Sequence, residues 1–183
     1  MARPSAPRPE LVLRIHVRIL AEPLHFTIEE MVEAARRVYA TAGVRIELGS
    51  VEWIDIPHLR RYVSVGTCTQ GALTPDQDLL FSIPAKIPAG EVAIYFVAEL
   101  EPRMHGCAAH PVHAPGAVIA NTATRWTLAH ELGHVLGIGH VHDVHRLMTG
   151  WGTEAIPRAV PLLVPSEIRI VRASPLLRET RSE

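Results

Sequence analysis

Hydrophobic and polar residues alternate in the first patterned segment of the chain. In "LVLRIHVRIL", residues 11–20, every second residue is apolar, and Arg14, His16 and Arg18 fall between the apolar positions. A period of two predicts a β-strand with one buried face. His16 is therefore expected on the polar face of this strand and not as a metal ligand.

A helix is expected after this strand. Thr27 and Glu30 stand three residues apart at the start of "FTIEEMVEAARRVYATAGV", residues 26–44, and form a capping-box signature. The apolar residues that follow recur at helical spacing, and Gly43 stands where a glycine can end the helix. The next segment, "VRIEL" at 44–48, alternates again and predicts a second strand.

The middle of the chain gives a weaker pattern. Residues 55–90 are punctuated by proline and glycine, and we interpret them as loops with one short strand at Leu79 to Ser82. The apolar run "EVAIYFVAEL" at 91–100 predicts a strand, and "GAVIA" at 116–120 predicts a short one. The segment between them, 101–115, is expected to be a loop.

Local sequence patterns predict the structure of the two ends of the chain. The segment "VPSEIRIVRASPLL" predicts a last helix that Pro175 stops, and residues 1–10 predict a flexible tail. Because 183 residues suit one domain with a sizeable core, we expect a single domain over 11–183. We place an N-terminal lobe at 11–139 and a C-terminal lobe at 140–183.

The charge composition excludes several classes of partner. Lys and Arg number 18, Asp and Glu number 19, and no basic stripe alternates with aromatic residues. We therefore expect neither a nucleic acid nor an anionic membrane as partner. The opening "MARPSAPRPE" lacks the apolar core of a secretory signal, and no run is long enough to span a bilayer. The compartment is left undetermined, and we expect a monomer.

The segment "HELGHVLGIGH", residues 130–140, carries the candidate chemistry. His130 and His134 are four residues apart, so on a helix they stand on one face and can reach the same metal ion. Glu131 lies about 100° around the helix from His130. There its carboxylate can hold a water molecule without ligating the metal.

His140 can share that ion only if the helix ends first. On an unbroken helix it would lie about 15 Å along the axis from His130, too far for two imidazoles that each reach about 2.1 Å. Gly137 can take a positive φ and turn the chain back, and Gly139 adds a second permissive point. The sequence therefore predicts that the helix ends between His134 and His140.

These residues predict a catalytic zinc site. Three neutral imidazoles, from His130, His134 and His140, leave the fourth position of a tetrahedral zinc ion open to water. Glu131 can take a proton from this zinc-bound water and pass it to a leaving amine, which is the chemistry of peptide hydrolysis. The alternative is a buried helix whose histidines are satisfied by neighbouring groups.

The pattern HExxHxxGxxH followed by a methionine resembles the signature of the metzincin zinc metallopeptidases. It consists here of His130, Glu131, His134, Gly137 and His140. Met148 in "HRLMTG" is the candidate turn methionine, and its short separation from His140 looks more like matrixins and small bacterial members. In the family this methionine lies beneath the metal as a hydrophobic base. An ordinary core methionine is the alternative.

The resemblance implies an α+β fold. Its expected parts are a twisted five-stranded mixed sheet with an antiparallel edge strand, an active-site helix, a backing helix, and a small C-terminal lobe with the methionine turn and a terminal helix. In the family the edge strand pairs with extended substrate. The candidate ledge here is Val92 to Val97, with Val92, Ile94 and Phe96 as substrate-binding residues. The same apolar run also fits a buried central strand.

Three further residues lie close to the motif. Some metzincins carry a tyrosine ligand two residues after the turn methionine, but Gly150 stands there, so the resemblance implies a four-coordinate zinc at rest. Trp151 either lines the pocket for the residue after the scissile bond or packs as a core aromatic. Asp143 either supports a ligating imidazole or caps a turn.

Two other groups invite a functional interpretation. Cys68 and Cys107 are the only cysteines and stand outside any CxxC motif, so they form either one disulfide or two free thiols. His105, His110 and His113 loosely resemble the loop that holds a second zinc in matrixins. Because the acidic ligand of such a site is missing, we interpret them as solvated loop histidines.

The residues and the resemblance together predict a zinc-dependent endopeptidase with one catalytic zinc and a peptide or protein substrate. A zinc-binding interaction module of peptidase fold, or a latent or narrowly specific protease, is the alternative. The presence of Glu131 argues against the interaction module, because such a module has no need of a base. The resemblance allows an extracellular location.

Overall fold

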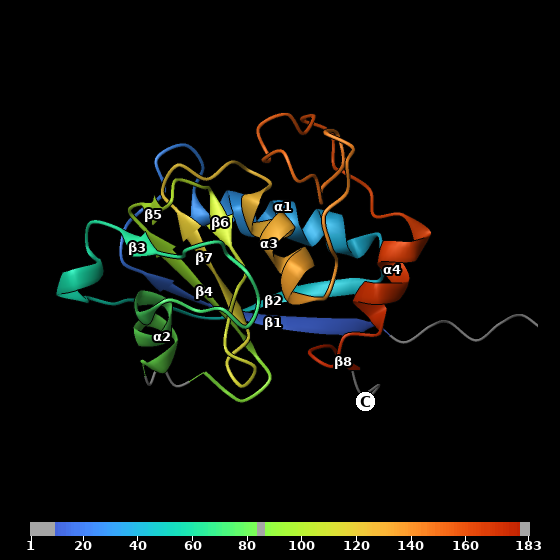
Figure 1. Cartoon of the computed structure of the whole chain (residues 1–183). Coiled ribbons are helices and arrows are strands. Elements are labelled where there is room, and N and C mark those ends of the chain that lie inside the picture. The colour runs from blue at the N-terminus through green and yellow to red at the C-terminus, as the bar shows by residue number, and fades with distance from the viewer. Residues whose placement is uncertain (1–9, 84–86, 180–183) are drawn as a thin grey trace, which may run out of the picture.

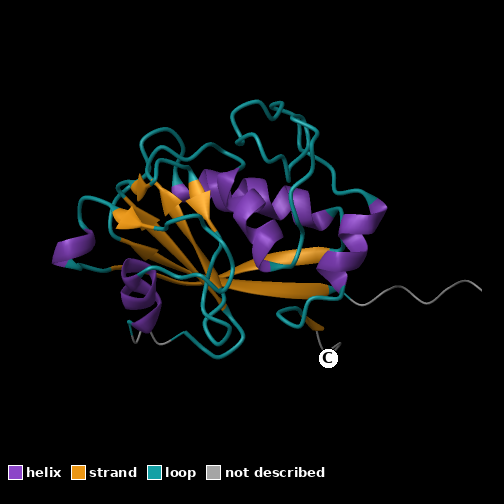
Figure 2. Cartoon of the chain, viewed as in Figure 1, coloured by secondary structure: helices purple, strands orange, loops and turns teal. Residues whose placement is uncertain are grey.

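The computed structural model describes residues 10–83 and 87–179, so nearly all of the expected N-terminal tail lies outside the described residues. A twisted sheet carries α1 and α3 together on one side (Figures 1 and 2). The elements are β1 (Leu11–Ile19), α1 (Ile28–Ala40), β2 (Val44–Trp53), a short 3₁₀ helix (Pro57–Leu59), β3 (Val63–Ser64), α2 (Pro75–Ser82), β4 (Val92–Val97), β5 (Leu100–Glu101), β6 (Gly106–Cys107), β7 (Gly116–Ala120), α3 (Thr127–Val135), α4 (Pro165–Arg172) and β8 (Arg178–Glu179).

The main sheet is mixed. Its strands follow the order β2-β1-β4-β7-β6, and β8 adds to the start of β1. Strands β2, β1, β4 and β7 are parallel to one another, whereas β6 runs antiparallel to β7 and β8 runs antiparallel to β1. The expectation of a mixed sheet with an antiparallel edge strand agrees with this arrangement, although the sheet has six strands in place of the five expected.

The first helix begins where its capping signals predict. The Thr27 hydroxyl accepts a hydrogen bond from the Glu30 amide at 3.1 Å, and the Glu30 carboxylate accepts one from the Thr27 amide at 2.8 Å. These contacts satisfy two of the amide groups that a helix start leaves unpaired. Gly43 follows the helix with a φ of +68°, which confirms its predicted place at the helix end.

The core has two halves, one on each face of the sheet. Met31 and Val38 of α1 and Leu132 of α3 pack against one face, where they bury the apolar side of both helices. Leu80 and Phe81 of α2 belong to the apolar cluster on the other face. Burial on both faces explains why the central strands read as nearly continuous apolar runs.

The prediction that residues 92–97 form the substrate ledge is wrong. This segment is β4, and it pairs with β1 on one side and with β7 on the other, so its backbone has no free edge. The side chains of Val92, Ile94 and Phe96 are fully buried between the sheet and the helices. The alternative of a buried central strand is correct.

The antiparallel edge is formed instead by β6, inside the segment 101–115 that was expected to be a loop. Gly106 pairs with Ile119, and Cys107 pairs with Val118 of β7. Two residues in a ladder are too few to give an alternating pattern. The position of β6 depends on the tertiary contacts described below.

The predicted strand at residues 79–82 is also wrong, because these residues lie in α2. Thr74 and Gln77 form a second capping box, and Pro75 occupies the first helical position, where its missing amide hydrogen costs nothing. The Gln77 side chain is fully buried and donates a hydrogen bond to the carbonyl oxygen of Ala109. The capping box is visible in the sequence, but the surrounding proline and glycine residues favoured the interpretation of this segment as a loop.

The C-terminal segment forms a helix and then a strand. Helix α4 begins at Pro165 and ends before Pro175, as expected, and the Glu167 carboxylate accepts a hydrogen bond from the Val164 amide. After the helix, residues 178–179 return to the sheet and pair with β1. The helix is therefore not the last element of the described chain. The division into lobes at residue 139 stays a prediction.

His16 and Arg18 lie on the polar face of β1 and are buried, whereas Arg14 on the same face is exposed. Its Nε2 atom lies 2.5 Å from the Glu91 carboxylate, and its Nδ1 atom lies 2.9 Å from the Ser50 hydroxyl. Arg178 of β8 donates to the same Glu91 carboxylate at 2.9 Å. His16 is only 6% exposed because these groups from β2, β8 and the start of β4 surround it.

The described residues contain no helix that is both long and apolar enough to cross a membrane.

Candidate metal centre

Helix α3 carries the first two histidines of the motif and ends where the third requires it. Gly137 has a φ of +100°. Its amide donates to the His134 carbonyl at 2.9 Å, and the Ile138 amide donates to the Gly133 carbonyl at 2.8 Å. This pair of bonds is the Schellman motif, which terminates a helix through a residue of positive φ. The chain then turns back, and His140 reaches the side of the helix that carries the other two histidines.

The three imidazoles converge through their Nε2 atoms. The distances are 3.1 Å from His130 to His134, 2.9 Å from His134 to His140 and 3.3 Å from His140 to His130. Ligands of a tetrahedral zinc ion at about 2.0 to 2.1 Å stand roughly 3.3 Å apart. In the described part of the chain, no other group of three or more His, Cys, Asp or Glu side chains converges in this way.

Backbone carbonyl groups fix the orientation of two of these rings. The Nδ1 atom of His130 lies 2.6 Å from the Leu147 carbonyl oxygen, and that of His134 lies 2.8 Å from the Ile138 carbonyl oxygen. A carbonyl oxygen only accepts, so each Nδ1 carries the proton and donates it. The Nε2 atoms are then unprotonated, and their lone pairs face the common centre.

The triad fits a divalent cation. Burial lowers the pKa of His130 to about 4 and also lowers the pKa of His134, so both rings are neutral at pH 7. Neutral Nε2 lone pairs that face one another at about 3 Å repel, and a cation among them turns this repulsion into ligation. Imidazole nitrogen is a preferred ligand for zinc.

Glu131 lines the same cleft as the triad and is almost fully buried. Burial raises the pKa of its carboxyl group to about 8, and a cation nearby favours its ionised form. A Cβ atom on Gly106 of β6 would lie 2.5 Å from the Glu131 Oε1 atom. The edge strand can therefore approach the carboxylate only because residue 106 has no side chain.

Met148 packs against the helix that carries the first two histidines of the triad. Its side chain is fully buried, and its Sδ atom would lie 2.3 Å from a Cβ atom on Gly133, the residue before His134. The glycine lets the thioether approach the helix backbone closely. Tyr39 of α1 supports the same helix, because its hydroxyl donates to the Ala129 carbonyl at 2.8 Å. The family role of Met148 stays a prediction.

The triad and Glu131 line a cleft of about 1310 Å³. Trp151 lines this cleft and is 71% exposed, so the alternative of a core aromatic is wrong for this residue. The Thr127 and Thr153 hydroxyl groups lie 3.0 Å apart in the wall. The cleft is thus open to solvent near the metal centre and carries both aromatic and hydroxyl side chains.

The other residues singled out near the motif have local roles. Asp143 accepts a hydrogen bond from the His145 amide at 2.9 Å, which favours the turn-capping interpretation. His105 pairs with Glu154 across the cleft, and its other ring nitrogen lies 3.3 Å from the Thr122 hydroxyl. This pair joins the segment before β6 to the segment after Met148.

Cys68 and Cys107 form a disulfide, with their Cα atoms 5.7 Å apart. Of the two alternatives that the sequence left open, the structure has the bonded one. The bond joins the loop after β3 to the edge strand β6, next to the cleft. It is one of the tertiary contacts that place β6, and no spacing rule in the sequence predicts it.

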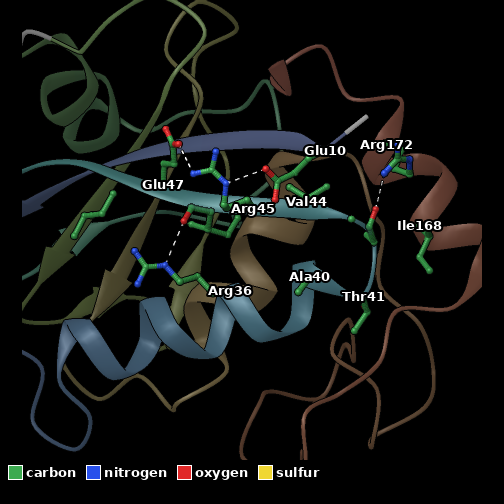
Figure 3. Close-up of a pocket in the computed structure, with 13 residues that line it drawn as sticks. Glu10, Arg36, Ala40, Thr41, Val44, Arg45, Glu47, Ile168 and Arg172 are labelled. Atoms are coloured by element: carbon green, nitrogen blue, oxygen red, sulfur yellow. Dashed lines mark hydrogen bonds and ion pairs between the residues drawn. The ribbon is translucent and has the colours of Figure 1, made fainter. Parts of the chain in front are cut away.

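A second hollow, of about 990 Å³, lies against the outer edge of β2, between α1 and α4 (Figure 3). Its polar side chains contact groups of the same wall: Arg45 pairs with Glu10 and Glu47, and Arg36 donates to the Ile46 carbonyl at 3.2 Å. Figure 3 also shows Arg172, which donates to the Ala42 carbonyl. The hollow has no convergent ligand set among its described residues, so we place the chemistry in the cleft of the triad.

Comparisons with known proteins place the fold. The chain superposes on metalloproteinase-II from Bacteroides fragilis with a TM-score of 0.65 at 16% identity, over 92% of this chain and 54% of that one. Archaemetzincin from Methanopyrus kandleri gives 0.59 at 14% identity, over 87% of this chain and 93% of the other. Archaemetzincin from Archaeoglobus fulgidus gives 0.54 at 14% identity, over 86% and 99%.

The chain has the fold of these metallopeptidases. It spans about half the length of the Bacteroides protein and nearly the whole length of the two archaeal ones. No protein-family model matches the sequence, and no curated protein matches it. At 14 to 16% identity the likeness rests on three-dimensional structure, so the chemistry is argued below from this chain's own residues.

Proposed function

We propose that the protein is a zinc-dependent endopeptidase. The observation that carries this proposal is the convergence of three Nε2 atoms within 3.3 Å of one another, with the Glu131 carboxyl group beside them in an open cleft. Three imidazoles leave one zinc position free, as catalytic sites require. The fold shared with a metalloproteinase and with archaemetzincins supports a peptide as substrate.

His130, His134 and His140 would hold one zinc ion. When bound, the ion would acidify a water molecule and polarise the substrate carbonyl. The two carbonyl groups that hold the Nδ1 protons of His130 and His134 keep their rings oriented for ligation. The ligand set itself favours zinc over cations that prefer oxygen ligands, since it consists of imidazole groups alone and no carboxylate oxygen belongs to it.

Glu131 acts as the proton carrier. Its carboxylate accepts a proton from the attacking water and later donates it to the nitrogen of the leaving amine, so it returns to its starting form in each cycle. Burial favours the neutral carboxyl group, so it assists the first transfer, in which the carboxylate takes the proton from the water. The two steps need one residue near both the water and the scissile bond, and Glu131 borders the edge strand and the triad.

The free edge of β6 is the surface for an extended peptide in this proposal. Strand addition satisfies the backbone groups of the peptide without regard to its sequence. Trp151, which is exposed beside the triad, supplies an apolar contact for one substrate side chain.

The experiment that tests the proposal is metal analysis combined with peptide cleavage. We expect one zinc ion per chain in the purified wild type, and less than a tenth of that in a His134→Ala variant dialysed against the same buffer. A mixed peptide library should be cleaved by the wild type, and cleavage should stop with a chelator and return with added zinc. One zinc ion without cleavage of any peptide would instead favour a binding module, and absence of zinc would contradict the metal centre itself.

A further inference from the structure

The free edge of β6 has a defined end. The His105 carbonyl accepts a hydrogen bond from the Ala120 amide of β7, so the backbone groups of residue 105 face the sheet. Amide and carbonyl groups of alternate residues point to the same side of a strand. The backbone groups of Gly106 therefore face away from β7, where an added strand would pair with them. The same alternation, continued past the end of β6 at Cys107, places those of Ala108 and His110 on this side as well.

The backbone groups of His110 are already occupied. The His110 amide donates to the Gln70 Oε1 atom at 3.2 Å, and the Gln70 Nε2 atom donates to the His110 carbonyl at 2.8 Å. One side-chain amide thus makes both hydrogen bonds that a residue of an added strand would make. The pairing positions left on this edge are Gly106 and Ala108.

The loop that carries Gln70 is anchored to the edge strand. Cys68, two residues away, is bonded to Cys107 of β6, and the backbone of Cys68 has a φ of +51°. The Cys68 amide donates to the Val65 carbonyl at 2.9 Å. The disulfide and this tight turn hold Gln70 beside His110, so the position of the Gln70 side chain at the end of the edge is fixed by the fold.

We propose that Gln70 ends the substrate-binding edge, so that the enzyme grips a peptide through only about three residues on the amino-terminal side of the scissile bond. This inference rests on the proposed function. Gly106 lies against Glu131 and marks the position of the chemistry. A peptide that pairs antiparallel, the more stable direction, runs from the His110 end toward Gly106. At about 3.3 Å per residue, roughly three residues fit before Gln70.

This proposal is tested by the binding of peptides whose position on the edge is fixed by a zinc-chelating group at one end. Peptides of one to six residues that end in a carboxyl-terminal hydroxamate chelate zinc and extend in the amino-terminal direction. We expect the affinity for the zinc-loaded wild type, measured by calorimetry, to rise up to three residues and then to change by less than twofold. In Gln70→Ala the amide and carbonyl groups of His110 become free to pair with the peptide. The affinity should then rise about tenfold as the peptide is lengthened from three to five residues.

Val112→Ala is the matched control for this experiment. Val112→Ala changes a residue that is 94% exposed near the same corner and leaves the contact of Gln70 in place, so it should behave as the wild type. The proposal is overturned if wild type and Gln70→Ala give the same length dependence. It is equally overturned if the limit appears instead in succinyl hydroxamates, which extend in the carboxyl-terminal direction.

The two proposals fail in distinguishable ways. Tight hydroxamate binding with the expected length limit but no peptide cleavage would refute the peptidase function and keep the role of Gln70. Peptide cleavage with no length limit would refute the role of Gln70 alone. If no hydroxamate binds the zinc-loaded protein, both proposals are wrong.

Discussion

Gly137 decides whether three histidines can meet. The motif places His130 and His134 on one helical face by spacing alone, but His140 reaches them only because the helix ends through a residue with a φ of +100°. This requirement is visible in the sequence, since a helix continued to His140 would separate it from His130 by about 15 Å. The prediction that the helix ends between His134 and His140 is confirmed.

Replacing Gly137 by alanine tests this requirement. A side chain at this φ is strained, so we expect a loss of about 1 to 3 kcal/mol in stability and a zinc affinity at least tenfold weaker. Competition with a chelating dye measures the affinity. Gly139→Ala is the matched control, because its Cβ atom would meet nothing within 4 Å. Equal zinc affinity in Gly137→Ala and the wild type would contradict this account of the turn.

Gly106 has a different reason to lack a side chain. An added Cβ atom would lie 2.5 Å from the Glu131 Oε1 atom, so either the carboxylate or the edge strand must move. We therefore expect Gly106→Ala to bind zinc nearly as tightly as the wild type but to lose about tenfold or more in kcat. Steady-state cleavage of one peptide, with zinc content measured in parallel, separates the two effects. A variant with full kcat would show that β6 does not need this close approach.

At the scale of elements, the sequence predicts those whose signals are local. The strand at 11–19 and the helix after Thr27 were predicted by alternation and by a capping box, and both are present. Helix α2 was missed although its capping box is equally complete, because eight residues between prolines resemble a loop.

The edge strand was assigned to the wrong segment for a physical reason. Both β4 and an edge strand are extended, and an apolar run does not reveal which of its edges will be paired. The identity of β6 depends on its ladder with β7, the disulfide at Cys107 and the fit of Gly106 against Glu131. These are contacts between segments far apart in the chain, so no local pattern predicts them. The three histidines of the triad, by contrast, lie within eleven residues.

Glu91 joins three strands, and this gives a prediction about stability. Its carboxylate, almost fully buried, contacts His16 of β1 and Arg178 of β8 at the start of β4. Glu91→Ala leaves these groups without their acceptor, and we expect a loss of about 3 kcal/mol in the free energy of unfolding, measured with denaturant. Glu33→Ala, which breaks an exposed pair with Arg37, should stay within about 0.5 kcal/mol. Similar losses in both variants would show that the buried cluster adds no particular stability.

At the scale of the whole molecule, one sheet positions the cleft. Four parallel strands carry α1 and α3 on one face, and the antiparallel β6 borders the cleft at the edge (Figure 1). The histidine triad lies where α3, the edge strand and the segment after His140 meet, so each of these elements contributes to the cleft wall. The remote second hollow beside β2 lies at the other edge of the same sheet (Figure 3).

The disulfide links two parts of this architecture and should stabilise the whole. It closes a loop between residues 39 apart in sequence, which restricts the unfolded chain. We expect a Cys68→Ala/Cys107→Ala variant to lose about 3 kcal/mol in the free energy of unfolding, measured by denaturant titration. Unfolding of the wild type with its disulfide reduced serves as the independent check. An unchanged midpoint in both samples would contradict this role.

The most direct test of the central claim is the kcat of the Glu131→Gln variant at a zinc content equal to that of the wild type. The substitution keeps the size of the side chain beside Gly106 and removes its ability to accept and return a proton. We predict one zinc ion per chain in both proteins, and a loss of about 10² to 10⁴ in kcat for the cleaved peptide. Equal cleavage by both proteins at equal zinc would contradict the account of Glu131 as the proton carrier of a zinc peptidase.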